Sequence, residues 1–118
     1  PFHCTASGKT YLANLPAAKR RIFLASLNLH AYTSNTHTST ATLENELLKV
    51  TKNGYALDIE EFHDGMIAIA VPVRDSRRRY VAALAMHGPK QRFDLNDALE
   101  RRSLLMESAK LVSQTFGY

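Results

Sequence analysis

The sequence predicts an α+β domain in which helices flank a short antiparallel sheet. Leu43, Leu47 and Val50 recur at the i, i+4 and i+7 spacing of an amphipathic helix. Two short apolar runs, residues 66–73 and 80–87, are rich in β-branched or small side chains and are separated by a charged segment. We therefore expect a hairpin that packs against helices.

The first residues predict a loop followed by a short helix. Thr5 or Ser7 can cap this helix, because a hydroxyl in front of a helix accepts a bond from a first-turn amide. Pro16 should end it. The residues expected to face inward are Tyr11, Leu12 and Leu15.

A second helix is predicted over residues 17–27, because the preceding proline is compatible with a helix start. Its basic residues 19–21 should face water, and its apolar residues are Ile22, Phe23 and Leu27. The polar residues 28–38 then form a surface connection.

A third helix should begin at Ser39 as the capping residue and stop at Gly54, which can adopt the left-handed conformation after Asn53. Residues 55–58 are expected to be short and extended. Residues 59–65 are expected to form an acidic turn.

The strand over 66–73 should be buried on both faces, with Pro72 near its end, and residues 74–79 should connect it to the strand over 80–87. A lone hairpin is marginally stable. We therefore expect further strands of the sheet upstream of residue 1. Asp94 and Asp97 should cap a closing helix whose inward residues are Ala98, Leu105, Ala109, Val112 and Phe116.

Length and composition indicate one soluble domain. A chain of 118 residues can bury one core, and no apolar run approaches the roughly 20 residues that cross a bilayer. The single cysteine, Cys4, has no partner for a disulfide, which favours the cytoplasm. The net charge of +4 comes from separate clusters at 19–21, 77–79 and 101–102, a scatter that argues against a nucleic-acid surface.

Most catalytic and metal-binding patterns are absent. Gly8, Lys9 and Thr10 resemble the end of a phosphate-binding loop, but His3 stands where that loop needs a glycine. The five histidines lack the spacing of metal ligands. The adjacent carboxylates of Glu60 and Glu61 should diverge and solvate a loop or pair with an arginine.

Two polar features could serve a ligand. The turn at residues 5–8 opens a helix, whose unbonded N–H groups could hold an anion, although simple capping is the commoner role of such hydroxyls. Asp58 could accept a bond from a ligand hydroxyl or cap a loop. Cys4 beside His3 could act as a nucleophile, but no third partner is identifiable and packing is the simpler role.

A family resemblance covers nearly the whole chain, from residue 1 to Phe116. It is carried by HCTASGKTYLANL, then NGYALDIEEFHDGMIAIAVPVRD, then YVAALAMHGP. These segments resemble, in order and spacing, the effector-binding domain of IclR-type bacterial transcriptional regulators. The resemblance implies a GAF-like curved antiparallel sheet with flanking helices.

In such regulators the effector-binding domain follows an N-terminal winged helix-turn-helix that binds DNA. The resemblance therefore implies that residues 1–118 form one effector-binding domain, truncated at its beginning and without the DNA-binding segment. It also implies a homodimer or a dimer of dimers, with no enzymatic activity, no cofactor, no metal and no membrane contact.

By the same resemblance, backbone amides at the first helix hold the carboxylate of a small organic acid, and Asp58 and His87 meet its polar remainder. Some members have cysteine where this chain has Ala68, and serines where it has Ala85 and His87. The pocket should then be roomier and less polar, which favours an aromatic or similarly bulky acid. The residues implied are Ala6, Ser7, Gly8, Asp58, Met66, Ala68, Ala85 and His87.

Two other functions remain open at this stage. The domain could be a dimerisation module with a vestigial pocket, which predicts a filled interior beside Ser7, Asp58 and His87. It could also be a small enzyme that uses Cys4 or His87. The sequence leaves the effector, the operator and the direction of regulation open.

Overall fold

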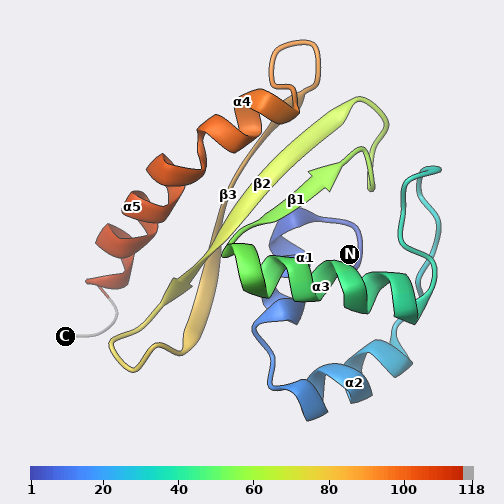
Figure 1. The fold of residues 1–118 in the computed structure, drawn as a ribbon, viewed down its shortest axis with the longest axis horizontal. Helices are drawn as coiled ribbons and strands as arrows, with labels where there is room; N and C mark the ends of the chain where they lie inside the picture. The colour runs from blue at the N-terminus through green and yellow to red at the C-terminus, as the bar shows by residue number, and fades with distance from the viewer. Residues whose placement is uncertain (116–118) are drawn as a thin grey trace.

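The computed structural model describes residues 1–115, which fold into five helices and one three-stranded sheet (Figure 1). The sheet separates α4 and α5 on one side from α1, α2 and α3 on the other. The helices are α1 (Ala6–Ala13), α2 (Ala17–Ser26), α3 (Thr40–Asn53), α4 (Leu95–Glu100) and α5 (Arg102–Ser113). The strands are β1 (Ala56–Ile59), β2 (Met66–Arg74) and β3 (Tyr80–Pro89). This arrangement confirms the α+β class.

The sheet is antiparallel with the order β1-β2-β3, so β2 is central. The predicted hairpin is confirmed as β2 and β3. The segment expected to be short and extended is a strand in its own right, because Ala56–Ile59 pairs with the outer side of β2. Asp58, Ala68 and His87 stand opposite one another across the three strands and therefore share one face.

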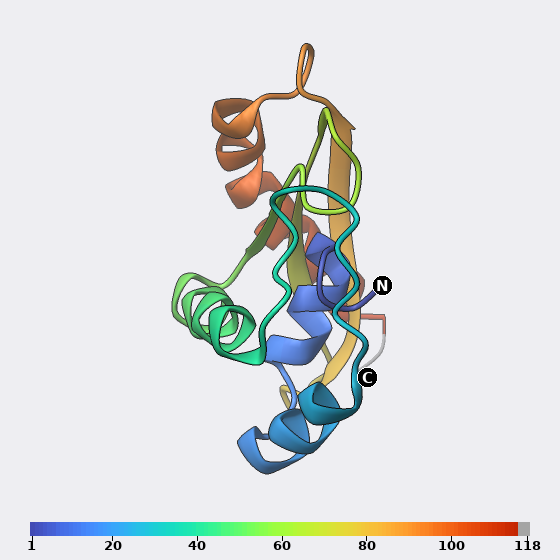
Figure 2. The ribbon, with the colours of Figure 1, turned by 90° about the vertical axis from the view of Figure 1, so that its right-hand side faces the viewer.

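The two faces of the sheet carry side chains of different size. Toward α4 and α5, the odd-numbered residues of β2 are large and pack with Ala98, Leu105 and Ala109. Toward α1, the even-numbered positions include Ala68 and Ala70, and a second core forms between α1, α2 and α3. The predicted burial on both faces of β2 is thus confirmed for the face toward α4 and α5, whereas on the face toward α1 only Ala70 is fully buried and the other positions are half-buried. Figure 2 shows the same ribbon turned by 90°, with α1 lying over the strands.

The third helix has the predicted ends. Ser39 caps α3, since its Oγ accepts from the Thr42 amide at 3.2 Å. Gly54 ends it with a φ of 82°. In α1 the cap is Thr5, whose Oγ1 accepts from the Gly8 amide at 3.0 Å, and Leu12 is fully buried.

The apolar face predicted for α2 is partly wrong. Ile22 is 75% exposed, whereas Leu24 is 1% exposed and joins the core beside α1 and α3. Phe23 and Leu27 are half-buried against the same core. A helix turns by about 200° over two residues, so burial of Leu24 points Ile22 to solvent.

The closing helix is two helices, which corrects the prediction of one. Arg101 separates them through a tighter turn, in which its amide donates to the carbonyl of Ala98 at 3.1 Å. The capping box of Asp94 and Asp97 is confirmed. Val112 is 37% exposed and lies at the margin of the buried face, and Phe116 falls outside the described residues.

Candidate ligand pocket

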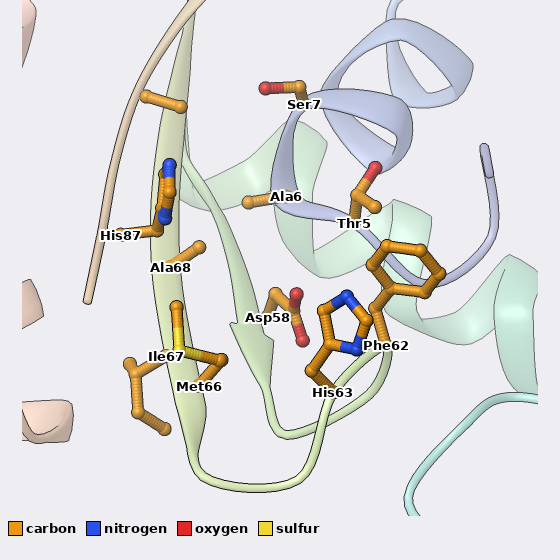
Figure 3. Close-up of a pocket in the computed structure, with 11 residues that line it drawn as sticks. Thr5, Ala6, Ser7, Asp58, Phe62, His63, Met66, Ile67, Ala68 and His87 are labelled. Carbon is orange, nitrogen blue, oxygen red and sulfur yellow. The ribbon is translucent and has the colours of Figure 1, made fainter. Parts of the chain in front are cut away.

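A cavity of about 290 Å³ lies between the first turn of α1, the β1–β2 loop and the sheet (Figure 3). This volume is near the lower end of the roughly 300–1,000 Å³ that is common for small-molecule sites. Its lining is mostly apolar, with a few polar groups from different elements. The lining residues are Thr5, Ala6, Ser7, Asp58, Phe62, His63, Met66, Ile67, Ala68, Ala85 and His87.

The start of α1 lines this cavity through Thr5, Ala6 and Ser7. Thr5 caps the helix and bonds the Gly8 amide, while the Lys9 amide donates to the Thr5 carbonyl. The amides of Ala6 and Ser7 have no acceptor within residues 1–115. Two first-turn N–H groups and the positive end of the helix dipole therefore remain for an anion.

The sheet wall of the cavity is built from small side chains. Ala68 on β2 and Ala85 on β3 line it, and His87 stands directly opposite Ala68. Alternation along the strands places these residues on the face toward α1. A bulkier residue at 68 or 85 would occupy the space that the two methyl groups leave.

Asp58 is the acidic group of the pocket and is 7% exposed. Its Oδ1 accepts from the Glu61 amide at 2.8 Å, so it caps the loop and lines the cavity at once. Burial raises the pKa of the Asp58 carboxyl, against that bond and the charge of Lys9. A ligand hydroxyl that donates to this carboxylate would return part of the solvation that burial removes.

The β1–β2 loop supplies Phe62 and His63 to the cavity (Figure 3). Positive φ values at Glu60 (53°) and Gly65 (80°) bend this loop, and Glu60 Oε1 accepts from the Gly65 amide at 2.8 Å. The connection before α3 holds the loop from outside. Its Thr33 and Thr36 hydroxyls each donate at 2.6 Å to loop carbonyls.

The structure brings together most of the residues that the resemblance implies. Gly8 does not line the cavity. Its hydrogen faces the chain start, where a Cβ would lie 2.6 Å from the Cα of Phe2. The residues that do line it are Ala6, Ser7, Asp58, Met66, Ala68, Ala85 and His87.

Sequence reasoning missed Phe62, His63 and Ile67 as lining residues, and it included Thr5 only as part of the turn at residues 5–8. The sequence signal for Phe62 and His63 is that an aromatic residue and a histidine stand within an otherwise acidic turn that ends in glycine. Sequence reasoning also missed that Lys9 is fully buried.

Lys9 forms a buried ion cluster behind the pocket. Its Nζ lies 2.8 Å from Glu46 Oε2 on α3 and 2.8 Å from Glu61 Oε1. Glu61 therefore pairs with a lysine, not with the arginine suggested by the sequence. Glu46, Glu61 and His37 could together ligate a metal ion, but the ammonium of Lys9 already supplies the positive charge between the two carboxylates.

The pKa values of this cluster reflect burial and the lysine charge. Burial alone would raise the pKa of Glu46, but the charge and hydrogen bond of Lys9 hold it below its usual value. Burial raises the pKa of Glu61 despite the same lysine. Burial, with the charge of Lys9, lowers the pKa of His37.

The Cys4 and His3 pair does not form a nucleophilic site. Cys4 is fully buried, and burial raises the pKa of its thiol to about 11. The Nε2 of His3 is 2.8 Å from the carbonyl oxygen of His30. Neither side chain lines the pocket.

No helix among residues 1–115 is both long and apolar enough to cross a membrane. This finding agrees with the short helices of the fold.

A family model described as bacterial transcriptional regulator IclR C-terminal matches residues 1–114. Over 99 residues, the chain is 40% identical to the probable transcriptional regulator SauR of Cupriavidus necator, which covers 84% of this chain and 39% of SauR. The chain spans less than half the length of the curated relatives it matches.

Two solved structures show the same fold. The crystal structure of the Thermotoga maritima IclR has a TM-score of 0.91 and 34% identity, over 99% of this chain and 47% of that one. A complex of 3-hydroxybenzoic acid with a double mutant of the Acinetobacter PobR inducer-binding domain has a TM-score of 0.91 and 29% identity. The match covers 96% of this chain and 65% of that one.

Proposed function

Because this chain belongs to the IclR family of bacterial transcriptional regulators and matches their C-terminal domain, we propose that it senses a small organic acid in the pocket between α1 and the sheet. The observation that carries this proposal is the pairing of two unbonded amides with an acidic group inside one apolar cavity. The amides of Ala6 and Ser7 would hold the ligand carboxylate. Asp58 and His87 would contact the other polar groups of the ligand.

An aromatic acid with a hydroxyl group fits this arrangement best. A flat ring can lie against the small side chains of Ala68 and Ala85, and Met66 offers a polarizable thioether at the margin. A second carboxylate is disfavoured near Asp58, since like charges repel and the burial of Asp58 weakens the screening of that repulsion by solvent. The 3-hydroxybenzoic acid in the structure of the related PobR domain supports this class.

The relatives are transcriptional regulators, and on this basis we place the domain within a DNA-binding protein that acts in the cytoplasm. A winged helix-turn-helix outside residues 1–118 would contact the DNA. A homodimer or dimer of dimers would let the acid change operator affinity through the subunit arrangement, which couples two sites.

The two alternative functions fit the structure less well. A vestigial pocket predicts a filled interior, whereas a cavity lies beside Ser7, Asp58 and His87. An enzyme that uses Cys4 would need a reactive thiolate, and this thiol is buried with a raised pKa. The relatives are regulators, not enzymes.

Isothermal titration calorimetry with a panel of acids tests the proposal. We expect 3-hydroxybenzoate and 4-hydroxybenzoate to bind more tightly than acetate or pyruvate, since only the ring acids fill the cavity. Binding by none of the aromatic or aliphatic acids would contradict the sensor function.

A pair of variants tests whether the acid occupies this cavity. Ala68→Leu fills the sheet wall and should weaken binding by tenfold or more, about 1.4 kcal/mol. Ala25→Leu makes the same chemical change on an exposed face of α2 and should leave affinity unaltered. Equal affinity in both variants would place the acid outside the proposed pocket.

A further inference from the structure

Lys9 is an unusual residue because its charged side chain is 0% exposed. The ammonium has three acceptor atoms within bonding distance: Glu46 Oε2 at 2.8 Å, Glu61 Oε1 at 2.8 Å and Glu61 Oε2 at 3.0 Å. A buried charge loses much solvation, and full pairing of this kind is what offsets the loss. The lysine is therefore held in one position.

Glu61 connects this ammonium to the pocket. Its side chain bonds Lys9 and also accepts from the Ile59 amide at 3.2 Å through Oε2. Its own amide donates to Asp58 Oδ1 at 2.8 Å. Glu61 thus bonds Lys9 through its side chain and the pocket carboxylate of Asp58 through its backbone amide.

Lys9 itself lies in α1, whose first turn supplies the unbonded amides of Ala6 and Ser7. The lysine therefore joins the two polar walls of the pocket, the helix start and Asp58, through a single residue of the β1–β2 loop. Glu46 attaches the same ammonium to α3.

This inference rests on the proposed function. We propose that Lys9 is a positioning residue of the pocket: through Glu61 it fixes the turn that presents the Asp58 carboxylate, and it thereby sets the preference for acids that carry a hydroxyl group. An acid without a hydroxyl would cover this carboxylate and offer it no donor beyond the Glu61 amide that already bonds its Oδ1. We expect about a tenfold preference of the protein for 3-hydroxybenzoate over benzoate.

The test uses the double variant Lys9→Met/Glu61→Gln. Removal of Lys9 alone would leave the two carboxylates of Glu46 and Glu61 without their cation in the interior, which would destabilise the whole fold. The double variant removes one charge of each sign and keeps an amide oxygen that can accept from Ile59. Glu46→Gln is the matched control, because it alters the same ammonium but leaves the Lys9–Glu61–Asp58 connection intact.

Amide hydrogen exchange by NMR gives a measurement that needs no ligand. In the double variant we expect the Glu61 amide to lose at least tenfold in protection, while amides in the centre of β2 keep theirs. Glu46→Gln should keep protection at Glu61. Unaltered protection at Glu61 in the double variant would overturn the positioning role.

Calorimetry with 3-hydroxybenzoate and benzoate gives the second measurement. The double variant should lose most of its preference for the hydroxylated acid, and Asp58→Asn should lose it as well. If Lys9 acts through Asp58, the triple variant Lys9→Met/Glu61→Gln/Asp58→Asn should show no further loss of the preference for the hydroxylated acid. Equal weakening of both acids, or an additive loss, would indicate a merely structural lysine and overturn the inference.

The two proposals can fail separately. If the wild-type domain binds neither acid, the proposed function fails, and the exchange measurement still decides whether Lys9 fixes the Asp58 turn. If the wild-type domain prefers the hydroxylated acid and the double variant keeps that preference, only the positioning role fails.

Discussion

Buried titratable side chains collect on one side of the pocket. Lys9, Asp58 and Glu61 are each less than a tenth exposed, and His37 lies 3.8 Å from Glu61 Oε1. Each group is charged or polar in a region that excludes water, so hydrogen bonds and ion pairs must replace solvent. No buried side-chain nitrogen or oxygen among residues 1–115 lacks such a partner. This complete pairing allows the loop beside the pocket to keep a single shape.

His37 should make the domain less stable in acid. Burial and the charge of Lys9 lower its pKa in the folded state, so the unfolded chain binds the proton more readily as the pH falls through about 6.5. This contribution to stability is complete above that pH and is lost below it. We expect the drop in Tm between pH 7.5 and 5.5 to be smaller in His37→Gln than in wild type.

The comparison isolates His37 because Asp58 and Glu61 are present in both proteins. Their raised pKa values act in the opposite direction, favouring the folded state as they take up protons. Identical pH profiles for the two proteins would show that the protonation of His37 is not linked to folding.

Cys4 should be unreactive in the folded domain. With a pKa of about 11, only about 0.1% of the thiol is ionised at pH 8, against about a quarter for an ordinary cysteine. Burial also blocks access. We expect labelling by Ellman's reagent to be at least 100-fold slower in the native protein than in guanidinium chloride. A native rate close to the denatured rate would contradict the burial of this thiol.

At the scale of single elements, helix ends do much to shape the molecule. Thr5 and Ser39 cap α1 and α3 with side-chain oxygens, and Asp94 and Asp97 cap α4 reciprocally. The cap on α1 also leaves two amides for the pocket. A local device that stabilises a helix therefore prepares a possible ligand contact.

Gly54→Ala should reduce the free energy of unfolding by about 1 kcal/mol, because a side chain strains the left-handed conformation that ends α3. A new Cβ would meet only Met106 Cε at 3.6 Å, so the cost is conformational and not steric. Urea denaturation measures it. Lys52→Ala, at an exposed position of the same helix, should change stability by less than about 0.5 kcal/mol. Equal changes in the free energy of unfolding for Gly54→Ala and Lys52→Ala would contradict a conformational cost at Gly54.

At the scale of the whole molecule, the two sheet faces perform different tasks. Large side chains of β2 pack against α4 and α5 and form a continuous core. On the opposite face, alanines let α1 approach the sheet closely, and the pocket opens where the helix begins. The same difference in side-chain size therefore separates a stabilising layer from a binding layer.

Two alanines on the α1 face should respond differently to the same substitution. Ala70 is fully buried, so Ala70→Leu should overpack the interface and lower stability by about 1–3 kcal/mol. Ala85 lines the pocket and is exposed, so Ala85→Leu should change stability little but block the acid. Thermal unfolding and calorimetry together measure both effects. A stable Ala70→Leu variant would contradict the close packing of α1.

Much of the fold was predictable because its signals are local. The cap at Ser39 and the stop at Gly54 each depend on residues within one or two turns. Side chains alternate along a strand, so the hairpin sequence alone places Ala68 and Ala70 on one face. The family resemblance implied most of the residues that line the cavity, and it also implied Gly8, which does not line it.

Tertiary structure decided what depends on distant parts of the chain. Lys9 pairs with Glu46 and Glu61, which lie 37 and 52 positions further along the chain. Nothing beside Lys9 in the sequence distinguishes a buried lysine from a solvated one. The same reason applies to Ile22 and Leu24, whose burial depends on where α1 and α3 lie, and to Phe62 and His63 in the pocket. Neighbouring residues determine helix ends and strand faces, whereas burial and charge pairing exist only once separate segments pack together.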